Sequence, residues 1–276
     1  MTKRIVALVL VMVLLGIPVS VGAQTYPSKS EVLSTVKKNL MVHKSGFTIK
    51  MSVQTMNELR KGKDFMYTVF EMDDKNTSKD YDYLKLNVDS WRESWKWSNV
   101  TGTASLTVTV EYATTLNQEK AVDQKIASIL KSLNLKGKSD YQKVKVIHDY
   151  LINHASYDKT LKNHTAYNAL INKSVVCEGY SLAAYRLFTD AGIPNRIITG
   201  TADGGPHSWN IVKVNGKWYN IDLTWDDPIT NSGKSVLRYD YFLKSNKDFK
   251  DHVRDAEFKT ATFNKNYPMA TKSYKK

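Results

Sequence analysis

The dipeptide Asn215-Gly216 separates two runs in which apolar and polar residues alternate. An Asn-Gly pair between such runs is the strongest short-range signal for a β-hairpin with a two-residue turn. The turn would pair Val214 with Lys217 and, counting back along both strands, Trp209 with Asp222. A register set in this way decides which side chains share a face of the sheet.

The same register places His207 and Asp222 on one face as diagonal neighbours, with Cα atoms about 7–8 Å apart. At that distance a carboxylate can hydrogen-bond to an imidazole, which is the relation between a general base and the group that orients it. A three-residue loop would shift the register by one position and separate the two side chains. Taken singly, His207 has the alternative of a satisfied surface histidine, and Asp222 that of a turn-associated carboxylate beside Asp226 and Asp227.

Cys177 is the only cysteine of the 276-residue chain, and it begins a helical pattern in the segment Val176-Cys177-Glu178-Gly179-Tyr180. A lone cysteine is either a buried small apolar side chain or a reactive thiol. In the first turn of a helix, unpaired backbone N–H groups and the helix dipole favour the thiolate, and a nearby imidazolium lowers the thiol pKa further. Cys177, His207 and Asp222 in this order therefore indicate a nucleophile, its base and its orienting carboxylate.

Several separate segments of the chain resemble the transglutaminase-like superfamily in its compact bacterial form. The resemblance extends over approximately residues 122–255 and is carried by Val176-Cys177-Glu178-Gly179-Tyr180, Gly192-Ile193-Pro194, His207-Ser208-Trp209-Asn210 and the run from Trp218 to Pro228. It implies a papain-like fold and a catalytic triad of Cys177, His207 and Asp222. It also makes Tyr167 and Trp209 candidates for lining the acyl pocket, and each has the alternative of packing in the core as an aromatic side chain.

The order of the expected elements predicts an α+β fold. Helical periodicity over 122–133, over 141–155 and after Cys177 is followed by alternating strands over 196–200, 207–214 and 217–224. The resemblance implies that these helices pack on the antiparallel sheet as a transglutaminase-like core. We expect this catalytic domain over residues 116–258, followed by a weakly specified C-terminal tail over 259–276.

Residues 24–115 are expected to form an N-terminal α+β region of unknown role. Alternating apolar residues over 84–88 and 106–110 predict a pair of antiparallel strands. Between them lie Trp91, Trp95 and Trp97, which could form a glycan-binding platform or pack against the core.

The first residues resemble a targeting segment rather than part of a fold. Lys3 and Arg4 precede an apolar run from Ile5 to Gly16, which is closed by Val21-Gly22-Ala23. This pattern predicts a signal peptide over residues 1–23, with a retained N-terminal anchor as the alternative. The run is shorter than the roughly 20 residues that a bilayer-spanning helix needs, and no later stretch is apolar enough, so stable membrane insertion is not expected. We expect a protein that is secreted or held at the cell surface.

The charge of the chain bears on its partners. Lysine and arginine number 40 against 27 aspartates and glutamates, and the net charge is +13. This indicates an anionic neighbourhood, such as a cell wall polymer or lipid headgroups, or a solubilising coat of lysines. Nucleic acid is not expected, because the lysines are scattered and the chain carries an export signal. Neither a metal nor a cofactor is expected, because metal-ligand spacing is lacking among His148, His154, His164 and His252.

Two classes of function remain open at this point. The resemblance implies a thiol enzyme that forms a thioester on a protein or peptide substrate, such as a cell wall or surface protein. An amine acceptor would then make it an acyltransferase, and water would make it a hydrolase. The alternative is a noncatalytic cell-surface binding protein on the same scaffold, which would use the three tryptophans and the lysines to hold a glycan or anionic polymer. The oligomeric state is left open.

Overall fold

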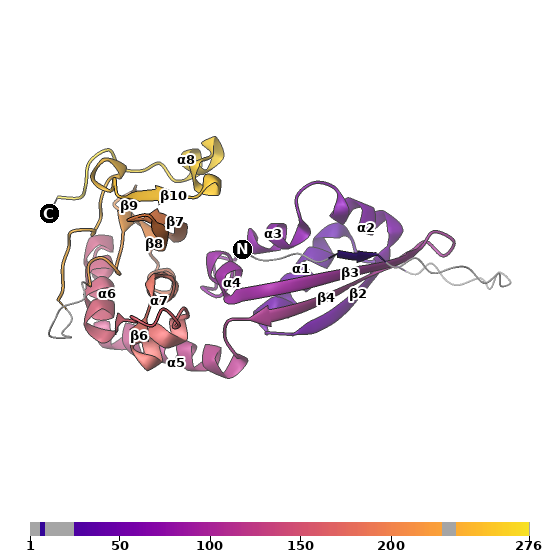
Figure 1. Cartoon of the computed structure of the whole chain (residues 1–276), viewed down its shortest axis with the longest axis horizontal. Helices are drawn as coiled ribbons and strands as arrows, with labels where there is room; N and C mark the ends of the chain where they lie inside the picture. The colour runs from indigo at the N-terminus through magenta and orange to yellow at the C-terminus, as the bar shows by residue number, and fades with distance from the viewer. Residues whose placement is uncertain (1–5, 9–24, 228–235, 276) are drawn as a thin grey trace. The chain divides into compact units, whose positions relative to one another are not determined.

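The computed structural model describes residues 6–8, 25–227 and 236–275 (Figure 1). The chain divides into two compact units, one made of residues 1–75 and 79–115 and the other of residues 76–78 and 116–276. The predicted signal peptide lies outside the described residues except for β1 (Val6–Leu8), which pairs in parallel with β3. Within the described ranges, no helix combines the length and the apolar character needed to cross a membrane.

The first unit contains a four-stranded sheet of order β1-β3-β4-β2. Strand β2 (Gly46–Ser52) and strand β3 (Val88–Ser98) both pair antiparallel with β4 (Thr103–Tyr112). Its helices are α1 (Lys29–Met41), α2 (Val53–Arg60), α3 (Phe65–Phe70) and α4 (Asp82–Asn87). Apolar side chains of the helices and of the sheet form one core, which includes Val32, Val36, Leu40, Met66, Leu106 and Val108.

Two expectations for this unit change in the structure. Residues 82–87 form helix α4, and the strand begins only at Val88, so the predicted strand over 84–88 is wrong. Three alternating apolar residues are too short a pattern to separate the two states, and Tyr83, Leu84 and Asn87 are buried at helical spacing. Trp91 and Trp95 belong to the buried core and Trp97 packs against it, so the structure supports the packing alternative for all three.

The second unit is α+β, as predicted. Its sheet has the order β10-β7-β8-β9, with antiparallel neighbours throughout. The strands are β7 (Asn195–Ala202), β8 (Gly205–Val214), β9 (Lys217–Ile221) and β10 (His252–Arg254). The helices are α5 (Leu116–Leu133), α6 (Asp140–His154), α7 (Cys177–Asp190) and the π-helical turn η1 (Asn168–Asn172). Helix α7 packs against β7 and β8, which joins the two layers (Figure 1).

The predicted hairpin register is confirmed. Strands β8 and β9 pair from Val214 with Lys217 back to Asn210 with Ile221. Both turn residues have positive φ angles, 48° at Asn215 and 80° at Gly216. A two-residue turn whose twist matches that of the flanking strands requires positive φ angles at both positions. Asn and Gly adopt positive φ angles more easily than other residues do.

The C-terminal residues are held by the second unit, so the expectation of a weakly specified tail over 259–276 is wrong. Helix α8 (Ala261–Asn266) follows the 3-10 turn η3 (Ala256–Lys259). Its N-cap is Thr260, whose hydroxyl accepts from the Phe263 amide. Phe258 and Phe263 are buried with the aromatic side chains of the sheet, and Met269 bridges to Trp218. A few large apolar side chains therefore anchor a segment that is polar on average.

Candidate active site

Cys177 is the first residue of helix α7. Val176 is the N-cap, and no side chain caps the first turn. A Cβ atom at Gly179 would lie 2.1 Å from the Val175 side chain and 2.7 Å from the Thr165 carbonyl oxygen. Only glycine therefore allows the first turn of α7 to pack so closely, which explains the glycine two residues after the thiol. The thiol lies at the helix end where backbone N–H groups lack helical partners and the dipole favours a negative charge.

The Cys177 thiol is half-buried and hydrogen-bonded to His207 of β8. Burial by itself would raise its pKa. The hydrogen bond and charge of His207, together with hydrogen bonds from Ser208, outweigh burial and lower the Cys177 pKa. The sulfur therefore has the surroundings of a thiolate rather than of an inert core cysteine.

The second nitrogen of the same imidazole reaches Asp222. His207 Nε2 lies 2.7 Å from Asp222 Oδ2, as the hairpin register leads one to expect. The other carboxylate oxygen, Oδ1, accepts from the backbone amides of Thr224 at 2.9 Å and Trp225 at 3.3 Å. Burial would raise the pKa of Asp222, but the hydrogen bonds from His207 and a second histidine lower it, so Asp222 is an anion beneath the ring.

The protonation of His207 follows from these two contacts. Burial acts to lower its pKa, but the hydrogen bonds to Asp222 and Cys177 raise the pKa to about 10. Because the thiol pKa is lowered and the imidazole pKa is raised, these contacts favour the proton on the ring and a negative charge on the sulfur. The surroundings therefore favour a thiolate–imidazolium pair beside a buried carboxylate, which is the state needed for nucleophilic attack.

A further histidine, which the sequence analysis did not assign to the site, completes the surroundings of Asp222. His252 is buried, its Nε2 lies 2.9 Å from Asp222 Oδ2, and its ring stacks on Phe249 at 3.8 Å between centroids. It reaches this position because edge strand β10 pairs closely with β7, where a Cβ at Gly200 would lie 2.1 Å from the Val253 carbonyl oxygen. No motif spacing identifies His252, because it lies 30 residues after Asp222.

The three side chains His207, Asp222 and His252 could in principle also hold a metal ion, since one ligand atom of each lies within 4.8 Å of the others. Both imidazole Nε2 atoms lie at hydrogen-bond distance from the same carboxylate oxygen. A cation bound to both Nε2 atoms would displace the hydrogen bonds that His207 and His252 make to Asp222. This arrangement fits proton-sharing better than coordination.

The two acidic residues that follow Asp222 have other partners. Asp226 lies 3.0 Å from His148 Nε2 of α6, and both side chains are fully buried. Asp227 accepts at 2.6 Å from the Tyr180 hydroxyl of α7. These carboxylates connect the turn after β9 to two helices, so the orienting position next to His207 belongs to Asp222.

The two candidate pocket residues, Trp209 and Tyr167, differ in how deeply they are buried. Trp209 is only 1% exposed, donates from its indole to Asn220 at 3.3 Å and packs beside the His207 ring. This burial favours the core-packing alternative for Trp209. Tyr167 is half-buried at the start of η1, which packs against α7, and its role in substrate binding stays a prediction.

The chain is similar in sequence and in fold to several known proteins. Residues 127–223 match the model of the transglutaminase-like superfamily. The kyphoscoliosis peptidase of Homo sapiens is 24% identical over 167 residues, 52% of this chain and 25% of that protein. Its Mus musculus counterpart is 26% identical over 140 residues, 42% of this chain and 21% of that protein. The chain thus spans a quarter or less of these relatives' length. A crystal structure titled as a TGase has a TM-score of 0.36 and 24% identity, over 48% of this chain and 44% of that one.

Proposed function

Because residues 127–223 of this chain belong to the transglutaminase-like superfamily, we propose that the protein is a thiol enzyme with Cys177 as nucleophile, His207 as base and Asp222 as orienting carboxylate. The observation that supports it most directly is the hydrogen-bonded series from the Cys177 sulfur through His207 to Asp222. Its reaction would be acyl transfer or hydrolysis at amide bonds of proteins or cell wall peptides.

The first half of the reaction makes a thioester. The Cys177 thiolate attacks the amide carbonyl carbon, a carbon–sulfur bond forms, and the carbonyl oxygen takes the electron pair. Backbone N–H groups in the first turn of α7 are suited to stabilise that oxyanion. When the carbon–nitrogen bond breaks, the imidazolium of His207 gives its proton to the departing nitrogen, which leaves as ammonia or an amine.

The second half regenerates the thiol site. Neutral His207 accepts a proton from an incoming amine or water, which attacks the thioester carbonyl, and the carbon–sulfur bond breaks to release thiolate. An amine gives an isopeptide product, and water gives a carboxylic acid. Asp222 holds the ring in the tautomer that both halves need.

The export signal expected over residues 1–23 and the basic charge support an extracellular setting for this chemistry. We therefore propose surface proteins or cell wall peptides as the substrate class. The noncatalytic alternative loses its main support, because Trp91 and Trp95 are 6% and 2% exposed and offer no stacking platform.

The test uses the full protein and its Cys177→Ala variant with a cell surface extract and a labelled primary amine. Label that enters the extract only with the unmodified protein identifies a transferase, and mass spectrometry locates the acceptor. Release of ammonia or new chain ends without label identifies a hydrolase. Equal product with the Cys177→Ala variant, or none with either protein, would count against the proposal.

A further inference from the structure

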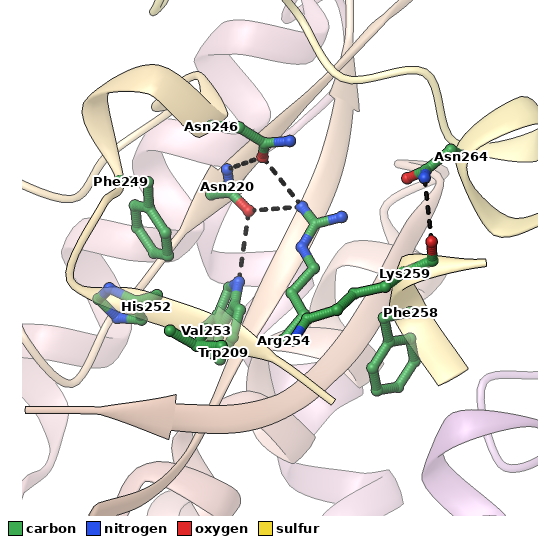
Figure 2. Close-up of a pocket in the computed structure, with 10 residues that line it drawn as sticks. All are labelled: Trp209, Asn220, Asn246, Phe249, His252, Val253, Arg254, Phe258, Lys259 and Asn264. Carbon is green, nitrogen blue, oxygen red and sulfur yellow. Dashed lines mark hydrogen bonds between the residues drawn. The ribbon is translucent and has the colours of Figure 1, made fainter. Parts of the chain in front are cut away.

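A cavity of about 290 Å³ adjoins the triad without being lined by it (Figure 2). Its lining residues include the cationic Arg254 and Lys259 and no acidic residue. The remaining residues are three carboxamides, the His252 ring and four apolar side chains, namely Asn220, Asn246, Asn264, Trp209, Phe249, Val253 and Phe258. The cavity is therefore positive and partly apolar.

Arg254 is held by neutral groups only. Its Nη2 donates to Asn220 Oδ1 at 2.9 Å and to Asn246 Oδ1 at 3.2 Å, and no described carboxylate lies within ion-pair distance of the guanidinium. Burial lowers the pKa of Arg254 to about 10. A half-buried guanidinium without a counter-charge is energetically unfavourable, and two parallel N–H groups are the natural partner of a carboxylate. Figure 2 shows the other terminal nitrogen pointing away from both amides.

The rest of the lining limits the size and character of a ligand. Lys259 follows Phe258 in η3, and no described acidic side chain pairs with its ammonium. Phe249 and Phe258 are almost fully buried and contribute an aromatic wall. A space of about 290 Å³ is at the lower end of ligand pockets, which corresponds to an amino acid rather than to a long chain.

We propose that this cavity binds a small carboxylate with an apolar body, its carboxylate on Arg254 and Lys259 and its apolar part against Phe249 and Phe258. A free acylated amino acid and the C-terminal residue of a peptide both carry this chemistry. His252 lines the cavity and also contacts Asp222, whereas Cys177, His207 and Asp222 do not line it.

The test is calorimetric titration of the full protein with N-acetyl-leucine, N-acetyl-leucinamide, a short peptide ending in leucine, and inorganic phosphate. We expect one N-acetyl-leucine per chain and no binding of the amide. Binding of the peptide in addition identifies a peptide end as a source, and its failure to bind restricts the site to the free molecule. Binding should persist in Cys177→Ala, because Cys177 does not line the cavity, so this result is independent of the thiol reaction.

Variants locate the site. Arg254→Met should weaken N-acetyl-leucine binding by about tenfold or more, since a charged hydrogen bond is lost. Lys259→Met, at an exposed position, should weaken it about threefold or more. Lys265→Met on α8 is the matched control and should leave the affinity unchanged. Equal affinity for the amide, binding of phosphate alone, or no difference between the Lys259 and Lys265 variants would overturn the proposal.

Discussion

The Nε2 atom of His252 lies 2.9 Å from Oδ2 of Asp222. The same oxygen lies 2.7 Å from His207 Nε2, while Oδ1 accepts hydrogen bonds from the backbone amides of Thr224 and Trp225. A carboxylate with four donors has little freedom to rotate, and its position then fixes the plane of the His207 ring. His252 Nδ1 is in turn 2.9 Å from Asp251 Oδ1, so the contacts that hold Asp222 in place extend to the edge strand of the sheet.

The reactivity of the thiol should depend on His207. Because Cys177 is the only cysteine, iodoacetamide reports on this site alone. The alkylation rate should have its pH midpoint well below the value of about 8.5 for a free thiol, because His207 lowers the Cys177 pKa. In His207→Ala the midpoint should rise past that value, since burial remains and the imidazolium is gone. Coinciding midpoints would mean that the two side chains do not interact.

Replacement of Asp222 by Asn should preserve the fold and slow the reaction. An amide cannot accept from His207 Nε2 as a charged carboxylate does, so the useful tautomer and the imidazolium are both disfavoured. We expect kcat to fall by on the order of 10³-fold or more, measured with circular dichroism as the check on folding. Asp240→Asn removes an exposed carboxylate and is the control. Equal rates for the two variants would rule out an orienting role for Asp222.

A methyl group at Gly200 should destabilise the second unit. The added Cβ would lie 2.1 Å from the Val253 carbonyl oxygen, so β10 must move, and His252 moves with it. We expect Gly200→Ala to cost about 1–3 kcal/mol in urea unfolding, the range for overpacking. Gly205→Ala on β8 is the control, because its nearest atom is 3.9 Å away. If Gly200→Ala leaves the urea midpoint unchanged, β10 does not lie as close to Gly200 of β7 as the structure shows.

The hydroxyl of Tyr180 should contribute to stability through Asp227. The two side chains are buried and 2.6 Å apart, so Tyr180→Phe removes a hydrogen bond from an anion that water cannot reach easily. We expect the free energy of unfolding to fall by about 1–3 kcal/mol. Tyr150→Phe, whose hydroxyl contacts His154 at a half-buried position, should cost less. Urea midpoints compare the two variants, and the reverse order would contradict the assignment.

Stability should also vary with pH through His207. Its pKa is about 10 in the folded protein against about 6.5 in an unfolded chain. A raised pKa stabilises the fold fully below pH 6.5, and the contribution is lost as the pH rises toward 10. In a Cys177→Ala background the ionisation of the thiol no longer contributes, and Asp222 alone raises the pKa of His207. The difference in urea midpoint made by His207→Ala should then shrink as the pH rises from 6 to 10. A constant difference would mean that the imidazole is not held as a cation.

Much of the site follows from local sequence signals. The Asn215-Gly216 turn sets the register of β8 and β9, and that register alone brings His207 and Asp222 onto one face. The helical pattern after Val176 likewise places Cys177 at the start of α7. The turn and the start of the helix each depend on the backbone conformation of a few consecutive residues, and the identity of those residues predicts that conformation.

Other features of the site depend on contacts between residues that are far apart in the sequence, and only the tertiary structure shows them. The alternating residues Leu84, Leu86 and Val88 predict a strand, but residues 82–87 form a helix, because burial in the core overrides a short local preference. His252 joins Asp222, and Arg254 enters the cavity, only because β10 pairs with β7 across some 50 residues. The sequence by itself identified Cys177 as the candidate nucleophile and the turn that places His207 beside Asp222. The second histidine and the basic cavity required the fold, since contacts between distant segments depend on packing that no local pattern records.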